Sequence, residues 1–204
     1  MPGSSFSALI LIADGTEEME FTITYDTFVR AGIACTSAYV AADEGESASP
    51  GPIIATGSRG IKFLPDVLFS DINQIHGTAK FDALIIPGGA KGAATISECA
   101  GVQALVRDYI DHGKIVGMIC AGSLAARTAK LPSQPLTSHP SVKEQLANDF
   151  LYSEEPVVVS GKLVTSRGPG TTFPFALTIV SMLLGPDKRK EVAGPMIFPE
   201  GTPW

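Results

Sequence analysis

Short apolar runs recur along the chain, and stretches with helical spacing of apolar residues separate them. Three runs are continuous enough to predict buried parallel strands, at Ala8–Ala13, Phe81–Ile86 and Lys114–Ile119. Ile33–Val40 predicts a further strand. Amphipathic spacing predicts one helix that ends at Gly32 and another, through Tyr109 and Ile110, that ends at Gly113. Asp14 and Thr16 are expected to cap the first helix.

The remaining pattern is weaker and predicts shorter elements. Ile53–Leu64 alternates as in a hairpin, and Val157–Ser160 with Lys162–Ser166 forms a second hairpin around Gly161. Apolar helical spacing predicts a helix over 173–184. The other expected segments are a surface loop at 43–52, a short helix at 71–75, a helix from Pro140 to about Asn148, and a Pro-rich tail from about 186 in which 194–204 lacks regular structure.

Strands and helices alternate along one uninterrupted chain. This order predicts an α/β fold, a doubly wound, flavodoxin-like sandwich with a mostly parallel central sheet and a single domain over 1–204. The runs at 8–13, 81–86 and 114–119 should occupy the centre of the sheet. Because parallel strands end at the same edge, the residues that follow these three runs are expected to meet in one crevice.

Composition narrows the class of protein. Of the 204 residues, 45% are hydrophobic and 18% charged, which favours a full globular core over disorder. The net charge of −6 and the lack of a basic run argue against nucleic acid as the main partner. The apolar runs are too short to cross a membrane, and no basic segment precedes the first run, as a signal peptide would require. Three cysteines without metal-ligand spacing predict free thiols, no metal site and a cytoplasmic or nuclear location.

Cys120 is the principal candidate for chemistry. It directly follows the 114–119 run, and Ala121 and Gly122 follow it, so it lies on a predicted sharp turn from strand to helix that needs small neighbours. The positive end of the following helix would favour a thiolate. Two interpretations remain open from this pattern, a reactive thiolate and a buried structural cysteine.

Other candidates follow the remaining central strands. Glu20 either stabilises the start of the first helix or supplies a carboxyl to the cysteine, which could then move a proton. His139, before Pro140, either caps a helix or acts as an acid or base. Gly88 and Gly89 form either a simple turn or a site for a developing negative charge.

Together these segments resemble the DJ-one/PfpI superfamily, in the branch of the parkinsonism-associated deglycase. With the strands and helices around them, they cover the chain from about Leu9 to Leu184. The segments that carry the resemblance are Ala13–Glu20, Arg30–Gly32, Leu84–Gly89, Ile119–Gly122, Thr137–Pro140 and Thr165–Thr171.

The resemblance assigns roles to individual residues. It implies that Cys120 is the nucleophile, with Glu20 and His139 as its carboxyl and histidine. It implies oxyanion binding by the N–H groups of Gly89 and Ala121, and substrate-side positions for Gly88 and Arg59. It also implies a homodimer in which the first helix, with Asp26 and Arg30, lies near the interface. Two features depart from close relatives: Ser123 replaces a frequent proline, and Glu191–Trp204 has no clear counterpart, so this tail could pack on the dimer or lie over the pocket.

The activity that this resemblance implies is a cofactor-free glyoxalase, which converts methylglyoxal to D-lactate without glutathione and acts as a lyase (D-lactate dehydratase) in the reverse sense. Removal of early glycation adducts from proteins and nucleotides is a further implied activity. The alternative is an oxidative-stress sensor or chaperone in which the same cysteine is oxidised to the sulfinate. A cysteine peptidase or amidotransferase is less favoured, because Ala121 stands where the peptidases have histidine and His139-Pro140-Ser141 lacks the His-x-Glu element.

Overall fold

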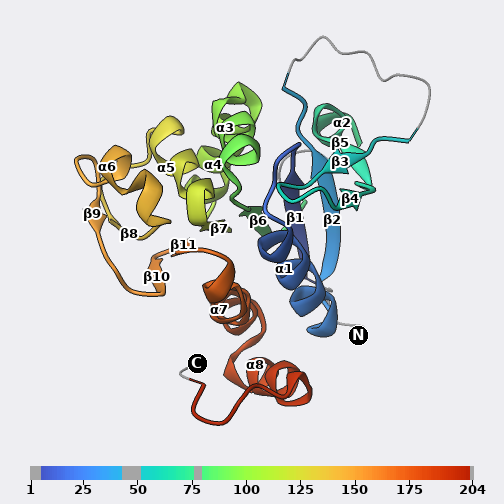
Figure 1. Cartoon of the computed structure of the whole chain (residues 1–204), viewed down its shortest axis with the longest axis vertical. Helices are drawn as coiled ribbons and strands as arrows, with labels where there is room; N and C mark the ends of the chain where they lie inside the picture. Colours follow the sequence, from blue (N-terminus) through green and yellow to red (C-terminus); the bar gives the residue numbers. More distant parts are fainter. Residues whose placement is uncertain (1–5, 43–51, 76–79, 203–204) are drawn as a thin grey trace.

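The computed structural model describes residues 6–42, 52–75 and 80–202 (Figure 1). A seven-stranded sheet forms its centre, with strand order β10-β11-β7-β6-β1-β2-β5, and two pairs of short strands, β3-β4 and β8-β9, lie outside it. The strands are β1 (Ser7–Ile12), β2 (Ala34–Tyr39), β3 (Ala55–Thr56), β4 (Lys62–Phe63), β5 (Val67–Leu68), β6 (Ala83–Ile86), β7 (Ile115–Ile119), β8 (Pro135–Leu136), β9 (Leu151–Tyr152), β10 (Val157–Ser160) and β11 (Leu163–Ser166). The helices are α1 (Glu18–Arg30), α2 (Phe69–Ile75), α3 (Ala90–Glu98), α4 (Ala100–Asp111), α5 (Leu124–Thr128), α6 (Lys143–Leu146), α7 (Thr172–Leu184) and α8 (Pro186–Ala193).

The three apolar runs lie side by side at the centre of the sheet, as predicted. β7, β6 and β1 are neighbours, all their contacts are parallel, and every residue of β6 and β7 is buried. Among the described strands of the seven-stranded sheet, β10 alone runs antiparallel, against β11, which confirms the hairpin around Gly161. The predicted α/β fold with a mostly parallel sheet is therefore confirmed. The apolar runs predicted it because strands that are buried on both faces need apolar residues throughout.

Helices cover both faces of this sheet (Figure 1). α1 and α7 pack against each other on one side, and α3, α4 and α5 lie together on the other. α7 reaches the sheet at Gly117 of β7, where a Cβ atom would lie 2.8 Å from side-chain atoms of both Ile179 and Phe175. The absence of a side chain at Gly117 thus lets the apolar helix predicted over 173–184 approach the central strands.

Two helices were not predicted from the pattern. α3 consists mainly of small residues, and it is held by close packing, since a Cβ atom on its Gly92 would lie 2.6 Å from Thr16 N. α8 is highly charged and buries only Val192, so it has no apolar stripe. The helix α8 therefore depends on tertiary contacts that periodicity does not record, whereas the buried face of α3 has helical spacing but mostly small side chains.

The structure tests the prediction for the C-terminal tail but hardly that for the loop at 43–52. Nearly all of the loop expected at 43–52 lies outside the described residues. After α8 the tail forms one 3-10 turn, Gly194–Met196, and the Phe198 ring then packs on Phe173 of α7 at a centroid distance of 5.0 Å. Within the described ranges, no helix has the length and apolar character needed to span a bilayer.

Candidate active site

Three central strands deliver the candidate residues to one edge of the sheet. Cys120 follows β7, the Gly88–Gly89 turn follows β6, and Glu20 lies in the first turn of α1 after β1. A Cβ atom at Gly88 would lie 2.7 Å from Glu20 Oε2 and 2.9 Å from Cys120 Sγ. The carboxyl and the sulfur therefore surround the same point, which confirms that the strand ends converge.

Cys120 occupies the sharp turn that its small neighbours predicted. Its φ angle is +62°, in the left-handed region that residues with a side chain rarely adopt. A Cβ atom at Gly122 would lie 2.5 Å from Ile86 O, so only glycine fits where the turn passes the end of β6. The turn continues as a 3-10 segment, Cys120–Ser123, before α5 begins. This geometry presents the sulfur at the edge of the sheet.

Glu20 is fully buried although it belongs to the first turn of a helix. Its Oε2 accepts a 2.6 Å hydrogen bond from the Gly88 N–H, and its Oε1 has no hydrogen-bond partner among the described residues. The helix cap is Glu17, whose Oε2 accepts from the Glu20 N–H at 2.8 Å; the caps expected at Asp14 and Thr16 are wrong. These two side chains instead accept from the N–H groups of Thr56 and Ala13. Because Glu17 caps the first turn of α1, the Glu20 carboxyl is not needed there and points into the protein interior.

Burial dominates the electrostatics of Glu20. It raises the pKa of the Glu20 carboxyl from 4.5 to about 7, although the Gly88 N–H and the contact with Cys120 partly offset this, and the charge on Glu17 adds to it. Glu20 can therefore hold or release a proton near neutral pH. This is the range in which a group is most effective as an acid or base.

Burial also raises the pKa of the Cys120 thiol, to about 12, and the neighbouring Glu20 carboxylate is the next cause. The expectation of a resting thiolate stabilised by a helix end is therefore wrong for the state in which Glu20 is ionised. The physical reason is that the 3-10 turn and α5 have only four and five residues, too few for a strong helix dipole, while a buried anion lies beside the sulfur. Since two adjacent anions are unfavourable, an anionic sulfur requires a protonated Glu20.

Backbone N–H groups partly counteract these effects on the sulfur. Those of Ala121 and Gly89 donate toward Cys120 and lower its pKa. Both are therefore placed to stabilise negative charge next to the sulfur, as expected for an oxyanion site. Gly89 has φ +87°, and a Cβ atom there would collide with Gly15 O, so the turn requires glycine.

Gly88 has a structural role at this site. Its N–H is already donated to Glu20, so it is not free to bind an oxyanion. A Cβ atom at this position would also lie 2.6 Å from the Cys120 Cβ. Gly88 thus positions the carboxyl and makes room for the cysteine. Its place among the substrate-binding residues stays a prediction.

His139 lies next to the cysteine turn and acts as a cap. Its N–H donates to Cys120 O at 3.3 Å, and its Nδ1 accepts from the Ser141 N–H at 3.2 Å. The Ser141 Oγ lies 2.8 Å from the same Nδ1. Because an N–H donor needs an unprotonated acceptor, the proton of the neutral ring is on Nε2. The structure confirms the capping interpretation of His139. Its role as an acid or base stays a prediction, which the cap allows because the neutral ring still has Nε2–H to donate.

Arg59 reaches the site through a contact that the sequence did not indicate. Buried Glu18 accepts from the Arg59 N–H and, at 2.8 Å, from the Ser58 hydroxyl. Burial would raise the pKa of Glu18, but these hydrogen bonds outweigh it and hold the pKa below its ordinary value. Glu18 therefore anchors the turn that carries Arg59. The sequence analysis missed Glu17, Glu18 and Ser141 as site residues. The only hint was that Glu17 and Glu18 lie close to Glu20 in the chain.

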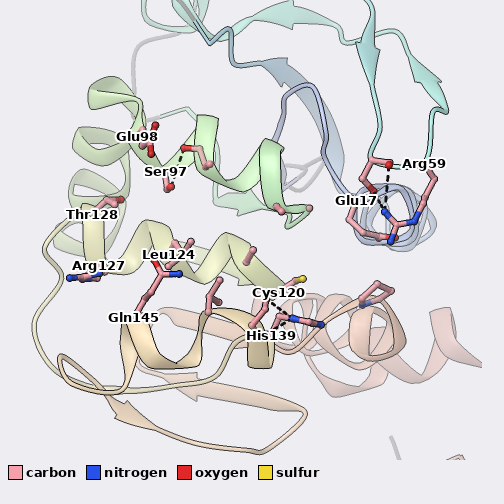
Figure 2. Close-up of a pocket in the computed structure, with 18 residues that line it drawn as sticks. Glu17, Arg59, Ser97, Glu98, Cys120, Leu124, Arg127, Thr128, His139 and Gln145 are labelled. Atoms are coloured by element: carbon pink, nitrogen blue, oxygen red, sulfur yellow. Dashed lines mark hydrogen bonds between the residues drawn. The ribbon is translucent and has the colours of Figure 1, made fainter.

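A cavity of about 670 Å³ opens over these groups (Figure 2). Cys120, Ala121, Gly89, His139 and Arg59 all line it, whereas Glu20 and Gly88 lie beneath its surface. Within the described ranges, no group of three or more His, Cys, Asp or Glu side chains has the arrangement of a metal site. The arrangement can place an electrophile against sulfur, with a proton donor or acceptor below it and N–H groups beside it.

Comparison with known proteins identifies a family that this chain matches over most of its length. A model of the DJ-1/PfpI family matches residues 6–182. The chain is 36% identical over 193 residues to the glutathione-independent glyoxalase DJ-1 of Schizosaccharomyces pombe, covering 93% of this chain and 97% of that protein. It is 33% identical to the glutathione-independent glyoxalase DJR-1.2 of Caenorhabditis elegans, covering 93% and 95%. The solved structure of S. pombe DJ-1 superposes with a TM-score of 0.85 at 35% identity, over 95% of this chain and all of that one.

Proposed function

Because the chain belongs to the DJ-1/PfpI family, we propose that it is a glutathione-independent glyoxalase that converts methylglyoxal to D-lactate. One observation carries the proposal: the Cys120 sulfur faces a cavity while the buried Glu20 carboxyl, with a pKa of about 7, lies against it. The pair offers a nucleophile and a proton acceptor in one place. The N–H groups of Gly89 and Ala121 supply the complementary charge.

The first step is addition of the thiol to the aldehyde. With a Cys120 pKa of about 12, the sulfur carries its proton at rest, and ionised Glu20 accepts that proton as the S–C bond forms. The aldehyde oxygen becomes an anion beside the N–H groups of Gly89 and Ala121. Glu20 then returns the proton to this oxygen, which completes a hemithioacetal.

The second step moves a hydrogen between two carbons. Glu20 removes the proton from C1 of the hemithioacetal, and the electron pair forms an enediolate. His139 donates its Nε2 proton to the C2 oxygen, and Glu20 protonates C2. The C1 hydroxyl then returns a proton to Nε2 of His139, which restores the ring. C1 rises to the thioester level while C2 falls to the alcohol level, so no external oxidant or reductant enters.

Water completes the reaction by attacking the thioester. The C–S bond breaks, the sulfur regains a proton, and lactate leaves. The atoms balance as methylglyoxal plus water giving lactate, and a cofactor is not needed for that balance. Glu20 lies on one side of the sulfur, which supports formation of a single enantiomer; the D configuration is the form that the family resemblance implies.

The test is lactate formation by the purified protein from methylglyoxal without glutathione. Chiral analysis of the product and an assay with added chelator address the D configuration and the absence of a metal requirement. We expect Cys120→Ser to lose activity, with Cys99→Ser as the matched control because Cys99 does not line the cavity. Absence of lactate, or equal lactate from Cys120→Ser, would refute the proposal.

A second function has support from the same pair. Oxidation of Cys120 by two equivalents of peroxide would leave a sulfinate anion. A protonated Glu20, whose Oε1 has no hydrogen-bond partner among the described residues, could donate a hydrogen bond to that anion. Intact-mass analysis after mild peroxide distinguishes this sensor role. Selective addition of two oxygens at Cys120 together with negligible turnover would favour the sensor over the glyoxalase.

A homodimer is the expected assembly. Support comes from apolar side chains left exposed on α1 and the adjacent hairpin, with Met19 at 50%, Val29 at 52% and Ile61 at 54% exposure. Sedimentation should give twice the mass of one chain, and a Val29→Glu variant should shift toward the monomer. A monomeric wild type at micromolar concentration would count against this assembly.

A further inference from the structure

The cavity is much larger than the proposed substrate. Methylglyoxal has about five heavy atoms, and at roughly 30 Å³ each it fills on the order of 150 Å³. The cavity holds about 670 Å³, within the range that encloses a considerably larger ligand. Most of its volume therefore lies beyond the reacting atoms.

The additional volume leads to a polar end away from the sulfur. In Figure 2, Glu98, Thr128 and Gln145 lie on the side of the cavity far from Cys120, between α3 and the α5–α6 region. Leu124 lines the cavity as well, so an apolar wall accompanies the polar end. A ligand bound to the sulfur could extend along this wall.

Two side chains at the remote end are available to a ligand. Among the described residues, neither the Glu98 carboxylate nor the Gln145 amide has a hydrogen-bond or ion-pair partner within the protein. Arg127, which lines the same end, is already paired with Asp149 at 3.0 Å. The carboxylate can only accept hydrogen bonds, and the amide can both donate and accept.

From this arrangement we propose that the remote end binds the hydroxylated chain of a sugar-derived 2-oxoaldehyde, with Glu98 and Gln145 as specificity-determining residues. Hydroxyl groups match both side chains, because each can donate to the carboxylate and exchange hydrogen bonds with the amide. A cationic substituent would match the Glu98 carboxylate but could only donate to the Gln145 amide, whereas hydroxyl groups match both side chains. The inference rests on the proposed glyoxalase function and names its substrate class.

Kinetics with two substrates test the inference. The probes are methylglyoxal and 3-deoxyglucosone, a six-carbon 2-oxoaldehyde with a hydroxylated chain. We expect Gln145→Ala and Glu98→Ala each to lower kcat/KM for 3-deoxyglucosone by about fivefold to tenfold, as for loss of one or two hydrogen bonds. The effect on methylglyoxal should be less than about twofold, because that substrate does not reach the remote end. Glu144→Ala is the matched control, as Glu144 is exposed on α6 next to Gln145 but does not line the cavity.

The outcomes separate this inference from the proposed function. Equal effects of the variants on both substrates, or turnover of methylglyoxal alone, overturn the inference and leave the glyoxalase intact. If neither substrate turns over, the proposed function fails, and binding of 3-deoxyglucosone to Cys120→Ser decides the inference. Chemical-shift changes of the Gln145 side-chain amide, and a Kd weakened about fivefold by Gln145→Ala, would support it. No change at that amide would overturn it.

Discussion

The buried carboxyl of Glu20 should make stability depend on pH in a direction opposite to that of most carboxylates. Its pKa is raised by burial from 4.5 to about 7. Between these values the folded chain retains a proton that the unfolded chain releases. The contribution of Glu20 to the free energy of unfolding is therefore fully present below pH 4.5, and it is lost as pH rises through 7.

The magnitude follows from the two pKa values. At 1.36 kcal/mol for each pKa unit, ionisation of buried Glu20 costs about 3 kcal/mol of folding free energy, of which about 2.5 kcal/mol is lost between pH 5 and pH 8. Glu20→Gln removes the ionisation but keeps the shape and an oxygen that can accept from the Gly88 N–H. The variant should therefore gain about 2.5 kcal/mol relative to wild type between pH 5 and pH 8.

Urea denaturation of both proteins at pH 5, 6, 7 and 8 measures this difference. Titrating groups that do not contact Glu20 contribute equally to both proteins, so they cancel when the free energies of unfolding are subtracted. Repeating the pair of measurements in a Cys120→Ser background removes the contribution of the coupled thiol. Glu144→Gln, at an exposed position on α6, serves as the control and should differ from wild type by a constant amount. A Glu20→Gln difference that does not change with pH, or that changes in favour of wild type as pH rises, would refute the account of Glu20.

Further predictions concern the neighbours of this carboxyl. In Glu20→Gln, the pKa of Cys120 should fall because the adjacent charge is gone, so iodoacetamide alkylation at pH 7.5 should accelerate, about tenfold for each pKa unit, while lactate formation falls by about 10²-fold or more. Gly88→Ala should lower the free energy of unfolding by about 1–3 kcal/mol in urea denaturation and abolish turnover, because its Cβ would lie within 2.9 Å of both reacting side chains. Ser141→Ala should reduce kcat by about fivefold, while nitrogen chemical shifts still show an unprotonated Nδ1 in His139, since the Ser141 N–H remains.

For each of these predictions there is either a control variant or a result that would contradict it. Slower alkylation in Glu20→Gln would mean that the carboxyl promotes the thiolate more than its charge opposes it. Gly170→Ala is the control for Gly88→Ala, because no atom lies within 4 Å of a Cβ atom there and its stability should be little changed. A protonated Nδ1 in wild-type His139 would contradict the capping arrangement.

Local pattern was enough to predict the central strands and to mark Cys120, whereas the roles of Glu20 and His139 came from the family resemblance and stay predictions. The buried strands β1, β6 and β7 are continuous apolar runs, and small residues after Cys120 mark a turn that larger ones could not form. These signals lie within a few residues of one another in the chain. The helix α8 escaped prediction because its charged residues leave no apolar period, and α3 was missed because its buried face consists mainly of small residues, which are a weak local signal.

The sequence by itself determined which groups could react, because the order of strands fixes which strand ends meet at one edge of a parallel sheet. Only the tertiary structure decided how those groups behave. It buries Glu20 fully and assigns the Gly88 N–H to it, and it holds Nδ1 of His139 on Ser141. Proton affinity depends on solvent exclusion and on neighbours that come from other segments of the chain, so no local pattern could indicate that the sulfur beside Glu20 keeps its proton at rest.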